Sequence, residues 1–429
     1  MKDNKYKNFI YFWLSQSVSQ LGSSMTSYAL IIWAYNQSNS VMSVSLMTFF
    51  SYIPYIIVSI FAGTFVDNTS KKKIMLYSDT IAAICSLFVL ILLILGKLQL
   101  WHIYIINSIT GFMNAFQSPA STVTIGIIVP KEMYTKASGM NSFTNSLLTL
   151  VTPMSAAFIL SILGLPGVII IDLLTFIFAF VILLFFVDIK EELNINIEKK
   201  KSIFHGFKEG LKFLINNKGI LYMIISMAFL NFFSRLTYEN ILSPMILARS
   251  NGNNNTLAIV SGTIGLGGIL GGLIVSFAKL PKSNLKLIYF SAAISFLFGD
   301  ILMGLGQNSY IWCIAAVAAS LPIPCIGAGI NTIMYNKVPR EIQGRIFAVR
   351  NAIQFCAIPI GILLGGFLAD YVFQPFMLSN NEISLFLQKL VGYSDGSGMA
   401  VMFLLTGVLG FLASIFWYLN KSIRALENN

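Results

Sequence analysis

Long apolar segments recur along the whole chain and are separated by short polar turns rich in Lys, Asn, Gly and Pro. A helix needs about 20 mostly apolar residues to cross the hydrocarbon core of a bilayer. Twelve segments reach that length, at approximately 9–35, 41–65, 74–96, 101–129, 137–163, 167–187, 219–247, 256–278, 286–305, 309–336, 346–372 and 398–419. The pattern therefore predicts an all-α integral membrane protein with twelve transmembrane helices.

The composition agrees with lipid as the solvent of most of the chain. Of the 429 residues, 56% are hydrophobic and 10% are charged, and the mean hydropathy is +0.76. Soluble domains carry about 25% charged residues, so an ordinary soluble protein is excluded. The first segment is longer than the apolar core of a cleavable signal peptide, which spans about 7–15 residues. We expect it to remain in the protein as the first helix.

The positions of the basic residues predict the orientation in the membrane. With a cytoplasmic N-terminus, 24 of the 28 Lys and Arg residues fall on the cytoplasmic side and three on the opposite side. Such a bias marks cytoplasmic loops. We therefore predict a multi-pass protein of the plasma membrane with both termini in the cytoplasm. The net charge of +11 follows from this topology, without nucleic acid as a partner.

The longest predicted cytoplasmic connection, residues 188–218, falls between the sixth and seventh helices. It divides the chain into an N-terminal six-helix bundle at 1–187 and a C-terminal six-helix bundle at 219–429. Apolar residues such as Phe204 and Leu211 recur within the connection at helical spacing. This spacing is typical of an amphipathic helix that lies on a membrane surface.

Signatures of catalysis and of cofactor binding are absent from the sequence. The phosphate-binding pattern G-x-x-x-x-G-K-[ST] does not occur, so ATP is not an expected partner. The two histidines and four cysteines show no metal-ligand spacing, and no G-x-S-x-G nucleophile elbow occurs. We expect no enzyme activity, no metal and no cofactor, and we expect any active transport to be secondary.

Ionisable residues inside the predicted helices are candidates for function, since a charge at the bilayer centre costs about 2.5–3.5 kcal/mol even on the mildest scale. These residues are Asp79, Asp172, Arg235, Glu239, Asp300 and Asp370. Arg235 and Glu239 stand four residues apart, on one face of the seventh helix, and can neutralise each other. We predict that Glu239 couples proton movement to transport with Arg235 as its partner, and Asp172 is the other candidate. A static buried ion pair is the alternative for the first two.

Polar residues form stripes along three predicted helices. They recur at helical spacing in the first, fourth and fifth helices, where lipid would leave them without hydrogen-bond partners. A water-filled cavity explains such stripes, and hydrogen bonds between helices are the alternative. The residues assigned to a substrate cavity are Gln16, Gln20, Asn107, Asn114, Gln117 and Asn145.

The loop after the second helix carries polar residues at a distinct spacing. Gly63 permits close helix approach, Asp67 lies where the second helix ends, and Lys71 and Lys72 follow in a cationic turn. A carboxylate near lysines and a helix N-terminus can form and break an electrostatic contact. We predict that these four residues form a conformational latch. An ordinary cytoplasmic loop, whose lysines serve the topology alone, is the alternative.

This loop resembles the signature loop of the major facilitator superfamily, from which Asn68 and Ser70 depart. Further short segments resemble the macrolide-efflux type of drug/proton antiporter. They are Ser19–Gly22, Lys72–Met75 with Asp79, Ser118–Ala120, Ile171–Asp172 with Phe176, and Val338–Pro339 with Gln343–Arg345. The resemblance implies the major facilitator fold of two six-helix bundles, a cavity lined largely by the first, fourth, seventh and tenth helices, and proton-driven export.

We therefore predict a secondary active transporter that exports bulky lipophilic compounds, such as macrolide-like antibiotics, by proton antiport with alternating access. Its expected partners are a small-molecule substrate, protons and membrane lipid. Two other functions fit the sequence. One is a dedicated exporter of one natural product, such as a siderophore or a peptide, and the other is a membrane sensor or immunity protein that binds its ligand without moving it.

Overall fold

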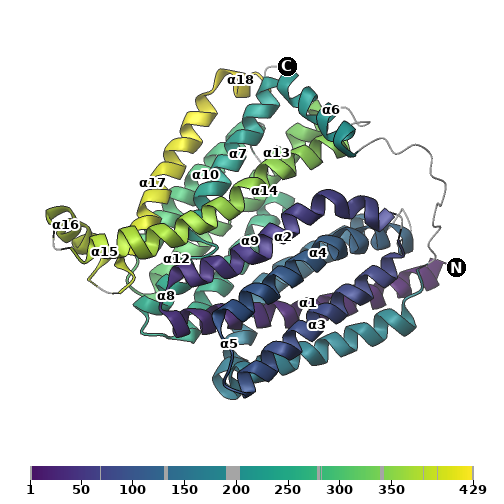
Figure 1. Cartoon of the computed structure of the whole chain (residues 1–429). Helices are drawn as coiled ribbons and strands as arrows, with labels where there is room; N and C mark the ends of the chain where they lie inside the picture. The colour runs from purple at the N-terminus through teal and green to yellow at the C-terminus, as the bar shows by residue number, and fades with distance from the viewer. Residues whose placement is uncertain are drawn as a thin grey trace. The chain divides into compact units, whose positions relative to one another are not determined.

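The computed structural model describes residues 2–67, 69–129, 134–189, 203–277, 281, 283–338, 343–379, 381–393 and 395–427. Within these ranges the chain forms helices and no β-strand. Its internal contacts divide the chain into two compact units (Figure 1). One unit consists of residues 1–39 and 46–197, and the other of residues 40–45 and 198–429. The all-α fold expected from the hydrophobic pattern is confirmed.

The first unit holds the helices of the N-terminal half. They are α1 (Lys2–Ser38), α2 (Val41–Asp67) apart from its first turn, α3 (Lys71–Ile94), α4 (Leu100–Ile128), α5 (Tyr134–Val181) and the π-helical segment η2 (Ile182–Phe186). Buried apolar residues hold these helices together, among them Met25 of α1, Val89 of α3, Ile103 of α4 and Ile169 of α5. α3 begins after Ser70, whose hydroxyl accepts a hydrogen bond from the backbone N–H of Lys73.

α5 consists of two arms that meet at Gly164. This glycine has φ +66° and ψ −172°, a left-handed conformation that interrupts the helix and that glycine adopts without strain. Thr144 and Asp172 lie 28 residues apart in α5, yet they contact Ser17 and Ser23, only six residues apart in α1. A continuous helix would place those two α5 residues about 42 Å apart. The chain therefore turns back at Gly164, and both arms pack on α1.

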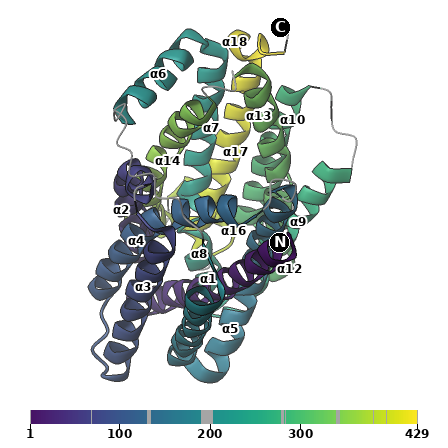
Figure 2. The same ribbon diagram turned by 90° about the vertical axis from the view of Figure 1, so that its right-hand side faces the viewer.

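The second unit holds the remaining helices. They are α6 (Ile203–Asn216), α7 (Lys218–Thr237), α8 (Leu242–Arg249), α9 (Asn254–Phe277), α10 (Asn284–Ile294), the π-helical η3 (Ser295–Asp300), α11 (Ile301–Leu305), α12 (Ser309–Ser320), α13 (Ile323–Lys337), α14 (Gln343–Phe367), the π-helical η5 (Leu368–Phe373), α15 (Gln374–Met377), α16 (Glu382–Val391), α17 (Ser397–Leu419) and α18 (Lys421–Arg424). Figure 2 shows α7, α10, α13, α14 and α17 running side by side.

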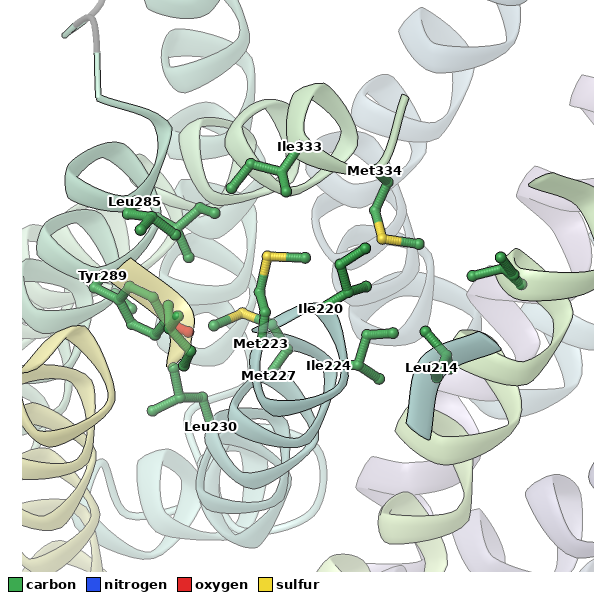
Figure 3. Packing of buried hydrophobic residues seen from close by; sticks show 14 of the residues in the cluster. Leu214, Ile220, Met223, Ile224, Met227, Leu230, Leu285, Tyr289, Ile333 and Met334 are labelled. Carbon is green, nitrogen blue, oxygen red and sulfur yellow. The ribbon is translucent and has the colours of Figure 1, made fainter. Parts of the chain in front are cut away.

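The core of the second unit is a continuous apolar cluster around α7. Met223 of α7, Tyr289 of α10 and Ile333 of α13 are buried in it, as Figure 3 shows. The Tyr289 hydroxyl is satisfied inside this core because it lies 2.7 Å from the hydroxyl of Ser226. Leu214, near the end of α6, is fully buried in the same cluster. α6 is therefore anchored to the second unit by its apolar face.

Every predicted transmembrane span lies on helical segments of this structure. Nine helices of the described chain are long and apolar enough to cross a membrane. One of them, Leu147–Phe186, contains the turn at Gly164 and so holds two predicted spans. The predicted spans outside these nine lie on α1 and α4, which carry two of the three predicted polar stripes. The linker predicted at 188–218 lies partly outside the described residues, and the predicted bundle boundaries stay a prediction.

The first turn of α2, within Ser40–Ser45, is held by the carboxylate of Asp370 from η5 in the second unit. The Ser40 hydroxyl donates to Oδ2 at 2.6 Å, and the backbone N–H groups of Val41 and Met42 donate at 3.1 and 2.9 Å. These N–H groups have no partner inside their own helix, so an acceptor placed there stabilises the helix start.

Candidate functional site

A small polar cavity lies inside the first unit. Its volume is about 20 Å³, which is room for about one water molecule. Two carboxylates and three hydroxyls give the cavity its polar character, and the rest of its lining is apolar. The polar residues are Asp79, Asp172, Ser19, Ser23 and Ser86. This is the candidate functional site.

Helical spacing brings these residues to one place. Asp79 and Ser86 lie seven residues apart on α3, so both project from one face of that helix. Ser19 and Ser23 are one turn apart on α1. At Gly22, a side-chain Cβ would stand 2.1 Å from the Thr175 hydroxyl oxygen of α5 and 3.0 Å from the Asp172 Cα. Glycine is therefore the residue that lets α1 and α5 approach each other at the cavity.

Asp172, a predicted coupling residue, is 5% exposed. The Ser23 hydroxyl of α1 donates to its Oδ1 at 3.0 Å, and the Ser86 hydroxyl of α3 donates to its Oδ2 at 2.9 Å. Both carboxylate oxygens thus have a neutral donor, each from a different helix. This carboxylate links α1, α3 and the second arm of α5.

Asp79 is 8% exposed and is bound by the side-chain amide of Gln117 from α4. The Gln16 side chain of α1 interacts with the same carboxylate. Two residues predicted to line a substrate cavity are thus found next to a carboxylate. The sequence named Asp79 as an intramembrane charge but did not pair it with Asp172. The seven-residue spacing of Asp79 and Ser86, which places both on one face of α3, was the sequence signal that could have predicted this cavity.

The other predicted cavity residues are not part of this small cavity. The Asn107 amide donates to the backbone oxygen of Met47 in α2 at 3.0 Å, which is a hydrogen bond between helices. Gln20, Asn114 and Asn145 have exposed side chains in the first unit. An exposed amide is more stable next to water than next to lipid. Their assignment to a substrate cavity stays a prediction.

Arg235 and Glu239 form the predicted ion pair and belong to the second unit, whereas the Asp172 cavity belongs to the first. Arg235 occupies the last turn of α7, and Glu239 lies in the turn that follows. Their side chains are 34% and 26% exposed, so the pair is only partly buried. The three predicted coupling residues therefore belong to two different units.

A further buried carboxylate, Asp300, lies at the end of η3 in the second unit. It is 1% exposed, and the hydroxyl of Thr406 in α17 donates to it at 2.8 Å. Gly407 allows this contact, because a Cβ there would lie 3.1 Å from the Asp300 Cβ. The sequence identified Asp300 as an intramembrane charge but not its partner on α17.

The predicted latch is described in part. The contacts of Gly63 and the side chain of Asp67 lie outside the described structure, so their part in a latch stays a prediction. Lys71 is buried at the start of α3. The Lys72 ammonium donates to the backbone oxygens of Leu184 and Val187, at 3.0 and 2.7 Å, at the end of η2. Among the described residues, no group of three or more His, Cys, Asp or Glu side chains could hold a metal ion.

Solved structures of transporters share this fold. A bacterial homologue of the human lysosomal transporter Spinster, in an inward-facing and unoccupied conformation, superposes with a TM-score of 0.70 at 14% identity, covering 100% of this chain and 98% of that chain. A bacterial homologue of the iron transporter ferroportin gives 0.69 at 12% identity, covering 97% and 99%. This likeness shows the fold, and the long apolar helices make it the fold of a multi-pass membrane protein.

The chain belongs to the family of the major facilitator superfamily described as "Transmembrane secretion effector", whose profile matches residues 4–395. Macrolide efflux protein A of Streptococcus pyogenes is 27% identical to it over 382 residues, which covers 86% of this chain and 92% of that protein. Macrolide efflux protein A of Enterococcus faecalis is 28% identical over 335 residues, covering 76% and 99%. The predicted family, a transporter related to the macrolide efflux proteins, is confirmed.

Proposed function

We propose that this transporter exports bulky lipophilic compounds, macrolide-like antibiotics among them, across the plasma membrane in exchange for protons. The similarity to macrolide efflux protein A supports the substrate class, because it extends over nearly the whole length of both proteins. The distribution of Lys and Arg supports cytoplasmic termini and a cytoplasmic linker at 188–218. Neutral and cationic compounds are the expected substrates, since Glu239 neutralises Arg235.

The buried carboxylate of Asp172 is the observation that carries the proton coupling. Its hydrogen-bond donors are the neutral hydroxyls of Ser23 and Ser86. A carboxylate inside a membrane protein is costly to maintain and is typical of a proton pathway. When the surroundings of such a group open to water on one side or the other, it can release or bind a proton there. Glu239, held by Arg235, is the second candidate for this role.

Alternating access completes the proposal. The N-terminal bundle at 1–187 and the C-terminal bundle at 219–429 would rock against each other around the bound substrate. The predicted latch of Gly63, Asp67, Lys71 and Lys72 would set the balance between the two conformations. Asp67→Asn should then slow turnover while equilibrium binding of substrate in detergent survives.

Transport of erythromycin, used as a macrolide probe, tests the function directly. In proteoliposomes, the protein should exchange labelled erythromycin for unlabelled erythromycin, and an imposed pH gradient should drive its accumulation. A sensor or immunity protein would bind the label without exchanging it across the bilayer. An exporter of a dedicated natural product would exchange neither erythromycin nor unrelated lipophilic dyes.

A further inference from the structure

α16 is a short helix in the connection between the predicted eleventh and twelfth spans. It runs from Glu382 to Val391 and lies beside α15 at one edge of the second unit (Figure 1). The long apolar helix before it ends at Met377, and the one after it begins at Ser397. α16 is therefore held within a few residues of the ends of two membrane-spanning helices, at the level where a bilayer surface lies.

One face of α16 packs on the second unit. Ser384 and Val391 are fully buried, and the side-chain amide of Gln388 donates to the backbone oxygen of Met377 at 2.5 Å. The backbone oxygen of Val391 accepts a hydrogen bond from Arg249 at the end of α8. Spacings of four and three residues place Ser384, Gln388 and Val391 on one side of the helix. α16 is thus fixed against the protein, so its other faces have defined directions.

A second face of α16 is apolar and exposed. Ile383, Phe386 and Leu390 follow each other at spacings of three and four residues, and all three side chains are exposed. We call these three residues the α16 stripe. Tyr393, just after the helix, and Tyr371, in η5 near the end of the preceding span, are also exposed. Tyrosine concentrates at membrane–water interfaces, so both mark the same level of the bilayer.

The charged residues of α16 lie on a third face. Glu382 and Lys389 are seven residues apart and both exposed. Their charges cancel, so anionic headgroups are not what would hold this helix. A helix with an exposed apolar face and a charged edge is typical of the plane of the membrane interface. The stripe is also too small for a stable contact with another protein, since such interfaces bury about 1,000 Å² or more.

We propose that α16 is an interfacial helix whose stripe of Ile383, Phe386 and Leu390 inserts among the acyl chains of the outer leaflet. The lipid contact depends neither on the transported compound nor on the proposed proton antiport. The assignment to the outer leaflet rests on the predicted topology. The connection between the last two spans is then held by the protein on one face and by lipid on another.

Quenching by brominated lipid tests the contact. Leu390→Cys is made in the full-length protein without its native cysteines and labelled with a small fluorophore such as bimane. In proteoliposomes, bromine on the acyl chains near the headgroups should lower the emission about twofold or more, because an interfacial helix lies about 5–10 Å deep. Bromine near the bilayer centre should quench less. Should Leu390→Cys fail to fold, Ile383→Cys places the fluorophore on the same stripe.

Leu385 provides a matched control. It is 39% exposed and Leu390 is 41% exposed, so the two leucines are equally accessible. They are five residues apart, which turns them about 140° from each other around the helix. A fluorophore on Leu385→Cys should therefore face water and keep its emission in brominated lipid. Equal quenching at both positions, or none at Leu390, overturns the proposal.

A charge placed in the stripe tests whether the stripe holds the helix in lipid. Phe386→Asp should reduce the quenching at Leu390 by about half or more, because a carboxylate is costly among acyl chains. Leu385→Asp should leave it unchanged. Unchanged quenching in the Phe386 variant overturns insertion of the stripe. Leu390 emission that follows the protein-to-lipid ratio and ignores bromine shows instead that a second copy of the chain covers the stripe, which also overturns the lipid contact.

The side of the membrane is tested separately in intact cells. A membrane-impermeant thiol reagent added outside should label Leu385→Cys, because this position faces water on the predicted outer side. Labelling only after the cells are opened overturns the outer assignment and the predicted topology with it. The comparison of Leu390 with Leu385 in proteoliposomes still decides on the lipid contact.

Discussion

The ammonium nitrogen of Lys72, at the start of α3, lies 2.7 Å from the backbone oxygen of Val187, just beyond η2. It also donates to the oxygen of Leu184 within η2. Carbonyl groups at the end of a helix have no partner within it, and a positive charge there is stabilised by the helix dipole. Lys72 therefore fastens the last turn of the N-terminal half to α3, and its part in the predicted latch stays a prediction.

Replacing Lys72 should weaken this junction. Lys72→Met removes both hydrogen bonds and should lower the free energy of unfolding by about 1 kcal/mol, the usual size for a partly exposed charged hydrogen bond. Thermal unfolding in detergent measures the change. Lys73→Met is the control, because Lys73 is adjacent and exposed. Equal melting temperatures for the two variants would show that the Lys72 contacts do not contribute to stability.

Two isosteric substitutions should separate the candidate coupling residues. Asp172→Asn should abolish accumulation of erythromycin driven by a pH gradient, because Asn cannot carry the proton. Glu239→Gln tests the partly exposed ion pair in the same way. Ser86→Ala is a third variant, which keeps the Asp172 carboxylate but removes one of its hydrogen-bond donors. Uphill transport is compared with exchange at equal pH for each variant. If only the Glu239 variant loses uphill transport, the coupling site lies in the second unit.

Cysteine labelling should locate the water-filled surface. Cysteines at Gln20, Asn114 and Asn145 should react with a small water-soluble thiol reagent, since these side chains are exposed, and bound erythromycin should slow the reaction. A cysteine at Asn107 should react more slowly because that position packs against α2.

The labelling needs a background free of native thiols and two apolar controls. Cys85, Cys313, Cys325 and Cys356 are first replaced by Ala. Cysteines at Ile31 and Leu90 should stay unreactive, because both positions pack within the apolar core of the first unit. Labelling of these controls at the rate seen for Gln20 would contradict a distinct polar surface.

Neighbouring glycines of α9 should respond differently to substitution. A Cβ at Gly271 would stand 2.1 Å from the backbone oxygen of Leu321, so Gly271→Ala must force the helices apart and should destabilise the protein by about 1–3 kcal/mol. Gly268 has no atom within 4 Å of its Cβ position, and Gly268→Ala should leave the melting temperature unchanged. Similar losses for both variants would show that helix propensity, and not packing, sets the cost.

The sequence predicted the spans well because the bilayer dictates the length and polarity of each helix. The turn at Gly164 agrees with the predicted break between residues 163 and 167, where Gly and Pro stand close together. Spacing alone could not tell Gly268 and Gly271 of α9 apart. Their roles differ because Gly271 faces Leu321 and the start of α13, whereas a Cβ at Gly268 would meet no atom within 4 Å.

The candidate site could be predicted only in part. Asp172, Gln16 and Gln117 were identified because polar residues are costly in lipid. That Asp172 and Asp79 line the same cavity depends on how α3 packs against the second arm of α5, which hydrophobic spacing does not reveal. Helical spacing also groups Asn107 with Gln117. It does not show that the Asn107 amide donates to a backbone oxygen, whereas the Gln117 amide donates to a carboxylate.

The tight reversal at Gly164 leaves no non-helical loop between the two arms of α5, although Ile162 and Leu163 at the turn are exposed. Ala156 and Leu165 lie on either side of this turn and share one apolar core, so an epitope tag or reporter inserted there would have to disrupt that core. α16 offers the contrast, since it is a separate short helix with exposed Phe386 and a following exposed Tyr393. A tag for antibody access from the predicted outer side should therefore be tolerated in the segment around α16 and should destabilise the protein at Gly164.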